Sequence, residues 1–246
     1  MKNRVYYGEY SLKHWIDLML SGNIVLPEYQ REFVWETRDI KRLIKSLKEG
    51  QFIMPVTIAQ YAPNGEEPKN LLLDGQQRLS SILLAWLGYE PNKSKFKASE
   101  SFAGEDDSAK EDIDLEKSDK PQAIAWKFEE LVKFKKRTKE ELVNAIKEEN
   151  EKEKEKVEKK EKDKGKKDTN DKTRYNKYNE LEGELFKDIN DDFLNNTFLG
   201  FSYIVPNSKE NIQNDFSQLF RNINYFGKKL SPLESRRSLY YMNTEP

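Results

Sequence analysis

The chain has 246 residues, enough for one domain with an insertion or for two small domains. Its 43 basic and 44 acidic residues leave a net charge of −1, so any nucleic-acid-binding face must be local. Cysteine is absent and His14 is the single histidine, which excludes disulfides, zinc–thiolate sites, thiol nucleophiles, His-based metal clusters and a Ser-His-Asp triad elsewhere. His14 is expected at a surface or half-buried position. No apolar run approaches the roughly 18 residues of a membrane span, and no signal peptide is visible, so a cytoplasmic protein without a membrane partner is expected.

The first 90 residues carry clear signals for regular structure. Ser11 and Thr37 are suitable helix caps, while Gly22, Gly50 and Gly88 are suitable helix ends. Apolar residues recur at helical spacing after Thr37 and form short runs where strands are expected. The predicted elements, in chain order, are a helix between Ser11 and Gly22, a strand at 24–26, a helix between Thr37 and Gly50, strands at 56–59 and 70–73, and a helix at 76–87.

The middle of the chain is far more polar. Residues 90–119 are expected to form a loop or to be partly disordered. A helix is expected around 124–131, and Thr138 with Glu141 forms a capping box for another. The 18 residues 151–168 contain 9 lysines and 7 acidic residues, which predicts either a solvated helix extension or a disordered tether.

Order is expected to resume near Tyr175. Apolar residues alternate along a strand at 199–205, Ser208 can open a helix, and Ser231 with Glu234 forms a further capping box. The chain is therefore divided into an α/β core (1–90), a charged helical or disordered insertion (91–175), and a C-terminal part of the same domain (176–246).

Three clusters could carry chemistry. In the first, a buried strand ends at Asp74 and a helix starts after Gly75, an arrangement that aims backbone N–H groups at an anion such as a phosphate. Gln76 and Gln77 offer amide donors, Arg78 can grip two phosphate oxygens, and Asp74 could hold Mg²⁺ or orient a water. A strand-to-helix turn whose polar groups only cap the helix is an equally weighted alternative.

The second cluster is the loop from Pro27 to Trp35. Tyr29 and Trp35 could stack on a DNA base, while Gln30 and Arg31 could bind phosphate or a base edge. The alternative is that the aromatic side chains only cover the core.

The third cluster lies near the C-terminus, in a loop that leads into a capped helix. A basic helix face exposed to solvent is the alternative to a phosphate site here. Its polar members are Arg221, Asn222, Asn224, Gly227, Lys228, Lys229, Glu234, Arg236 and Arg237.

Together the clusters resemble the N-terminal domain of GmrSD-type, modification-dependent restriction enzymes, over residues 24–88 and about 196–241. That domain is named for its DGQQR motif and belongs to the ParB/sulfiredoxin-like superfamily. The motifs, in order, are Leu26-Pro27-x-Tyr29-Gln30-Arg31-x-Phe33-Val34-Trp35, Leu73-Asp74-Gly75-Gln76-Gln77-Arg78-Leu79-Ser80-Ser81 and Leu219-Phe220-Arg221-x-Ile223-Asn224-x-x-Gly227-x-x-Leu230-Ser231-x-x-Glu234-x-Arg236.

The resemblance implies a small mixed sheet with surrounding helices, of α/β (α+β) class, that binds and hydrolyses a nucleoside triphosphate with Mg²⁺. It also implies recognition of modified DNA in anti-phage defence, together with an HNH nuclease subunit or domain, for which this chain lacks the histidines. The implied site comprises Asp74, Gln76, Gln77 and Arg78 for catalysis, with Asp74 as metal ligand. Gln30, Arg31, Gly75, Arg78, Asn224, Gly227 and Arg236 would bind the nucleotide, and Tyr29, Arg31 and Trp35 would bind DNA.

Two other functions stay open at this point. The chain could be a DNA- or protein-binding adaptor that keeps the fold without hydrolysis, or a nuclease that uses carboxylates and magnesium. A homo-oligomer is a further candidate assembly.

Overall fold

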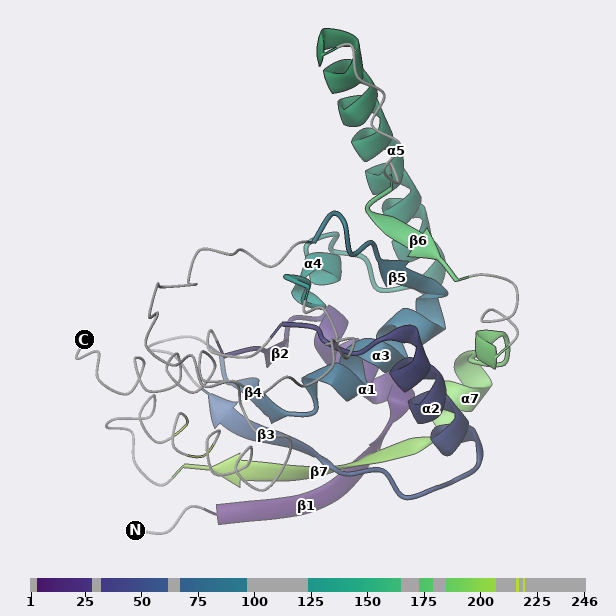
Figure 1. Cartoon of the computed structure of the whole chain (residues 1–246). Helices are drawn as coiled ribbons and strands as arrows, with labels where there is room; N and C mark the ends of the chain where they lie inside the picture. The colour runs from purple at the N-terminus through teal and green to yellow at the C-terminus, as the bar shows by residue number, and fades with distance from the viewer. Residues whose placement is uncertain are drawn as a thin grey trace, which may run out of the picture.

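The computed structural model describes residues 4–27, 32–61, 67–96, 124–164 (backbone alone for 160–164), 173–178, 185–206, 216 and 219 (Figure 1). A five-stranded mixed sheet carries α1, α2 and α3 on one face, which confirms the predicted mixed α/β class. The elements are β1 (Arg4–Ser11), α1 (Leu12–Leu20), β2 (Ile24–Val25), α2 (Thr37–Lys48), β3 (Val56–Tyr61), β4 (Lys69–Asp74), α3 (Gln76–Leu87), β5 (Tyr89–Pro91), α4 (Glu129–Val132), α5 (Lys139–Lys164), β6 (Tyr175–Lys177), α7 (Asp191–Asn196) and β7 (Phe198–Val205).

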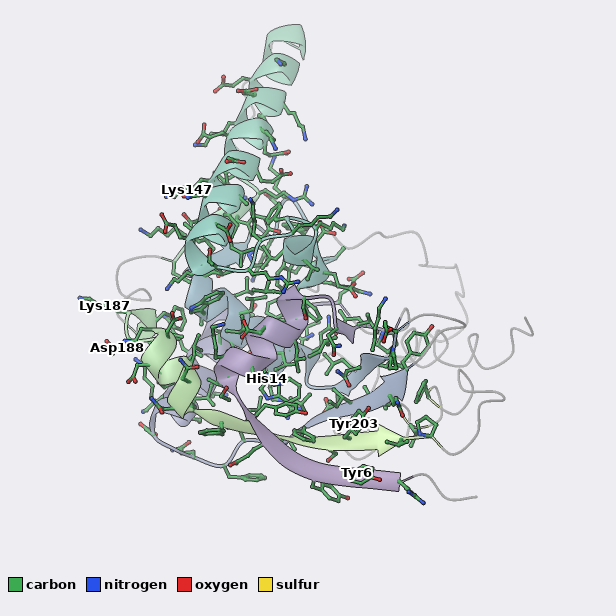
Figure 2. The ribbon with its side chains drawn as sticks, turned by 180° about the vertical axis from the view of Figure 1, so that it is seen from behind. Tyr6, His14, Lys147, Lys187, Asp188 and Tyr203 are labelled. Carbon is green, nitrogen blue, oxygen red and sulfur yellow. The ribbon has the colours of Figure 1, made fainter. Side chains whose placement is uncertain are left out.

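The sheet has the strand order β1-β7-β3-β4-β2. β1 pairs antiparallel with β7, and β7 runs parallel to β3. β3 pairs antiparallel with β4, and β4 runs parallel to β2. In Figure 2, seen from behind, Tyr6 and Tyr203 mark the paired β1 and β7, where they are opposite one another in register.

Both faces of β4 are covered, which explains its continuous apolar run. Leu72 packs in the main core between the sheet and the helices. Leu71 and Leu73 point to the other face and form a smaller core with Phe216. A strand buried on both faces reads as unbroken hydrophobic sequence rather than as alternation.

α3 is the central helix. Every residue in it except Arg78 is buried, and its observed bounds confirm the predicted helix at 76–87. Gly88 ends it in the left-handed conformation, with φ +77°, as the C-terminal glycine signal predicts.

Three of the predicted helix caps lie among the described residues, and two of these three agree with prediction; Ser208, Ser231 and Glu234 lie outside the described residues. Ser11 Oγ accepts a hydrogen bond from the His14 backbone N–H (3.2 Å), and Thr138 and Glu141 form the expected box. The predicted Thr37 cap is wrong, because Glu36 occupies the cap position and forms a capping box with Asp39. The Thr37 hydroxyl instead donates to Glu90 (2.9 Å). His14 is exposed and its ring contacts Tyr10 at 4.4 Å between centroids, as a surface position predicts (Figure 2).

The middle of the chain contributes to the main core. Trp126, Phe128, Leu142 and Ile146 are fully buried in it. Ile124 does not begin a helix as predicted, because its N–H and C=O form a β-bridge with Phe33. The boundaries of the three predicted segments stay a prediction, and 97–123 lies outside the described residues.

α5 continues well beyond the core and projects from the molecule (Figure 1). It carries Glu–Lys pairs three residues apart, such as Glu151–Lys154 at 2.8 Å. Of the two predicted forms for the charged run, residues 151–164 therefore adopt the helical one. Within the described ranges, no helix has the length and apolar character needed to cross a membrane.

Candidate functional site

The candidate site lies where β4 passes into α3. β2 and β4 run parallel, so their carboxyl ends point to the same edge of the sheet, where ligands of α/β proteins commonly bind. β3 starts at this edge, since Thr57 is opposite Asp74. Residues from three separate parts of the chain thus meet beside the first turn of α3.

Gly75 is required at this turn for two reasons. Its φ of +103° is a conformation that residues with a Cβ rarely adopt. A Cβ at this position would also lie 2.9 Å from Val56 Cγ2. Because glycine has no side chain, the N-terminus of α3 has no side-chain cap, and such uncapped N–H groups are the ones that bind anions at helix N-termini.

Gln76 is the most unusual residue of the site. Its side chain is only 3% exposed, yet neither its amide nitrogen nor its oxygen has a hydrogen-bond partner among the described residues. The buried hydroxyls of Ser80 and Ser81, on the next turn, likewise have no partners among the described residues. A buried polar group without a partner costs about 1–3 kcal/mol, which makes the Gln76 amide the candidate ligand contact of the turn.

Gln77, by contrast, bonds the protein through both its amide oxygen and its amide nitrogen. Its Oε1 accepts hydrogen bonds from the backbone N–H groups of Val34 (2.9 Å) and Trp35 (3.2 Å). Its Nε2 donates to the Glu32 carbonyl (3.0 Å). Gln77 therefore positions the 32–35 segment against α3.

Arg78 joins the turn to the segment before β3. One guanidinium nitrogen donates to Asp74 Oδ2 (2.6 Å) and the other to the Met54 carbonyl (2.9 Å). The Arg78 side chain is 12% exposed and that of Asp74 38% exposed, so the pair borders solvent. The guanidinium keeps further N–H groups for a ligand, since it has five donors in all.

Magnesium has a limited donor set here. No group of three or more His, Asp or Glu side chains that could hold a metal occurs in the part of the chain that the structure describes. Asp74 offers one carboxylate. A single carboxylate can hold Mg²⁺ only when phosphate oxygens of a nucleotide and water molecules complete the coordination shell of the metal.

The other predicted site residues divide into two groups. Trp35 is described and half-buried, and it lines a pocket next to Arg78. The remaining predicted residues lie outside the described ones, namely Tyr29, Gln30, Arg31, Asn224, Gly227 and Arg236.

The pocket beside the turn has a volume of about 450 Å³. Sequence reasoning missed most of it, because its walls come from α2 and from the segment before β3, which carry no recognisable motif. The run of three apolar residues at 52–54 was the sequence signal that could have indicated it, and two of them, Phe52 and Met54, are exposed. Its lining residues are Val34, Trp35, Asp39, Arg42, Leu43, Ser46, Phe52, Ile53, Met54 and Arg78.

A second pocket, of about 330 Å³, lies between α5 and β6 and shares no residue with the turn. Lys147, labelled in Figure 2, lies on its α5 side. Tyr175 lines it, and burial raises the pKa of that phenol to about 12. This pocket lies apart from the predicted motifs.

The fold and the turn define a class: a mixed α/β domain with an uncapped, glycine-initiated helix at the carboxyl edge of its sheet. The family described as "GmrSD restriction endonuclease, N-terminal domain" matches residues 12–241, and the chain belongs to this family. This confirms the resemblance found in the sequence and supports a role in a GmrSD-like restriction system.

An uncharacterised protein of Methanocaldococcus jannaschii is similar to part of the chain. It is 36% identical over 103 residues, which cover 32% of this chain and 17% of that protein. The chain thus matches less than a fifth of the length of this curated relative. No solved structure matches the chain.

Proposed function

We propose that this chain is a nucleotide-binding sensor domain of a GmrSD-like restriction system, which binds the phosphates of a nucleoside triphosphate at the first turn of α3. The observation that carries the proposal is the buried Gln76 amide, which has no partner among the described residues, at an uncapped helix N-terminus. Family membership supports the restriction context.

Each residue of the turn has a role in this proposal. Gly75 lets the backbone approach the phosphates, and Gln76 donates its amide to them. Arg78 adds positive charge, and Asp74 with the phosphate oxygens holds Mg²⁺. Gln77 is a positioning residue. Gln30, Arg31, Asn224, Gly227 and Arg236 are proposed as closing contacts on the nucleotide.

Nucleotide hydrolysis is proposed to switch the domain when it meets DNA, in particular modified DNA contacted by Tyr29, Arg31 and Trp35. DNA cutting is assigned to an HNH nuclease subunit or domain, since an HNH centre needs more histidines than His14 alone. The domain is proposed to act in the cytoplasm.

The test compares nucleotide binding by the wild type and by Gln76→Met, a change of similar volume that removes the amide. Calorimetric titration with each of four ribonucleoside triphosphates and Mg²⁺ should show binding by the wild type and a loss of about tenfold or more in the variant, consistent with one charge-assisted hydrogen bond. Unchanged affinity in a folded Gln76→Met protein would contradict the proposed site.

An adaptor that binds without hydrolysis is the second candidate. It is favoured by one observation: the Gln77 amide bonds the 32–35 segment through both its oxygen and its nitrogen, so it is held in a structural contact rather than aimed at a water. Phosphate release with and without DNA separates the two functions. Release above that of an Arg78→Ala control supports hydrolysis, and release equal to the control supports the adaptor. Metal-dependent nicking of plasmid DNA, lost in Asp74→Ala, would instead indicate a nuclease.

A further inference from the structure

The walls of the 450 Å³ pocket are fixed by the same turn that forms the proposed phosphate site. Gln77 accepts a hydrogen bond from the Trp35 N–H, and Arg78 donates to the Met54 carbonyl. Two consecutive residues of α3 therefore hold two of the segments that line the pocket. A ligand at the turn and a ligand in the pocket would touch the same residue, Arg78.

The pocket has apolar, flat surfaces that the protein leaves uncovered. Phe52 is 82% exposed and Met54 is 63% exposed, and Trp35 adds a half-buried indole. Exposed apolar side chains that lie together commonly mark a binding surface, whereas single scattered ones are normal. Aromatic and thioether groups of this kind cover planar rings well.

The polar groups of the pocket indicate the charge of the ligand. Arg42, on α2, is exposed and forms no ion pair with the described residues, and Arg78 borders the same space. The carboxylate of Asp39 already accepts a hydrogen bond from the Glu36 N–H (3.2 Å). Arg78 is already paired with Asp74 at 2.6 Å, so Arg42 is the cation that this side of the pocket offers to a ligand. Together with the aromatic side chains, this favours a ligand that carries a planar ring and an anionic group.

We infer that this pocket holds the base of the nucleotide whose phosphates bind at the α3 turn, with the ring against Phe52 and Trp35 and with Arg42 facing the sugar-phosphate. The inference rests on the proposed function and adds the base-binding subsite to it. It predicts that the base contributes to the affinity for the nucleotide, and that this contribution depends on contact of the base with the Phe52 side chain.

The experiment titrates each ribonucleoside triphosphate, and separately inorganic tripolyphosphate, into the full chain with Mg²⁺. Phe52→Ala is the test variant, and Phe52→Trp keeps an aromatic surface. Phe198→Ala is the matched control, because Phe198 is also an exposed aromatic residue (52%) and does not line the pocket.

The wild type should bind at least one nucleoside triphosphate more tightly than tripolyphosphate. Phe52→Ala should lose roughly tenfold to a hundredfold in nucleotide affinity, the range for loss of one stacking contact, without a change for tripolyphosphate. Phe52→Trp and Phe198→Ala should retain wild-type affinity.

Two failures are distinguishable. If tripolyphosphate and nucleotides bind equally well and Phe52→Ala has no effect, the base-binding subsite is wrong and the phosphate site stands. If neither ligand binds the wild type, the proposed function is wrong, and the base-binding subsite, which rests on it, is wrong as well.

Discussion

The Gln77 side chain holds the backbone of Trp35, 42 residues away in the chain, through a hydrogen bond of 3.2 Å. Its neighbour Gln76 is equally buried but bonds to none of the described residues. Two adjacent glutamines thus differ in their contacts: Gln77 positions the 32–35 segment, and the Gln76 amide has no partner among the described residues.

This difference predicts opposite effects on stability. Gln77→Leu should lower the free energy of unfolding by about 3 kcal/mol, because it removes three hydrogen bonds and leaves backbone N–H groups without partners. Gln76→Leu should be neutral or stabilising, since it replaces a buried amide that bonds to nothing in the described protein. Urea denaturation of both variants measures the difference. An equal loss in the two would contradict the roles assigned here.

Gly75 should be among the least replaceable residues of the turn. Gly75→Ala combines a positive φ of +103° with a contact of 2.9 Å to Val56, and we expect it to cost about 3 kcal/mol. Gly22→Ala, at φ +71° with nothing within 4 Å of its Cβ, should cost only about 1 kcal/mol. Adding Val56→Ala to Gly75→Ala should relieve the contact but leave the backbone strain. Thermal unfolding of the three proteins tests this, and equal costs at both glycines would refute it.

The raised pKa of Tyr175 predicts that the folded chain loses stability at alkaline pH. Burial raises its pKa from the ordinary 10.0 to about 12 in the folded chain, where its hydroxyl accepts a hydrogen bond from Trp126 Nε1 (3.3 Å). The unfolded chain loses this proton first as the pH rises, so the stabilisation is complete below pH 10 and is lost between about pH 10 and 12. The loss amounts to about 3 kcal/mol.

The matched variant is Tyr175→Phe, which removes the ionisable group and keeps the ring. Its stability should start lower, through the lost Trp126 contact, but should fall less steeply above pH 10 than that of the wild type. Parallel curves for the two proteins would show that Tyr175 does not carry the transition.

Asn150 should couple β6 to α5. Its Oδ1 accepts from the N–H groups of Arg174 (2.9 Å) and Tyr175 (2.8 Å), and its Nδ2 donates to the Tyr175 carbonyl (2.8 Å). Asn150→Ala should cost about 2–3 kcal/mol and speed hydrogen exchange in 173–178 selectively. Asn144→Ala, on an exposed position of the same helix, is the control. Unchanged exchange in 173–178 would exclude the coupling.

Much of the fold was predictable, because local signals and burial agree along most of the first 90 residues. α3 is the clearest example, since glycines mark both of its ends and its apolar content is high. β1 was not predictable: it is an edge strand whose Val5, Tyr6 and Tyr7 are all exposed, so it lacks the alternation that burial imposes.

The site was predictable in its residue types but only in part in its roles. The Asp74–Arg78 segment suggested an anion site because of its turn chemistry. The use of Gln77 depends on a segment 42 residues away, and the pocket depends on how α2 and 52–54 pack beside α3. Such long-range contacts leave no signal in local sequence.

The projection of α5 has a mechanical consequence. Among the α5 residues whose side chains are described, Asn150 is the last buried one, and the helix continues to Lys164, a rise of about 21 Å. A rotation of only 10° at this anchor would displace the far end by about 4 Å over that length. Because of this length, any change of angle where α5 leaves the core would be multiplied at the far end of the helix.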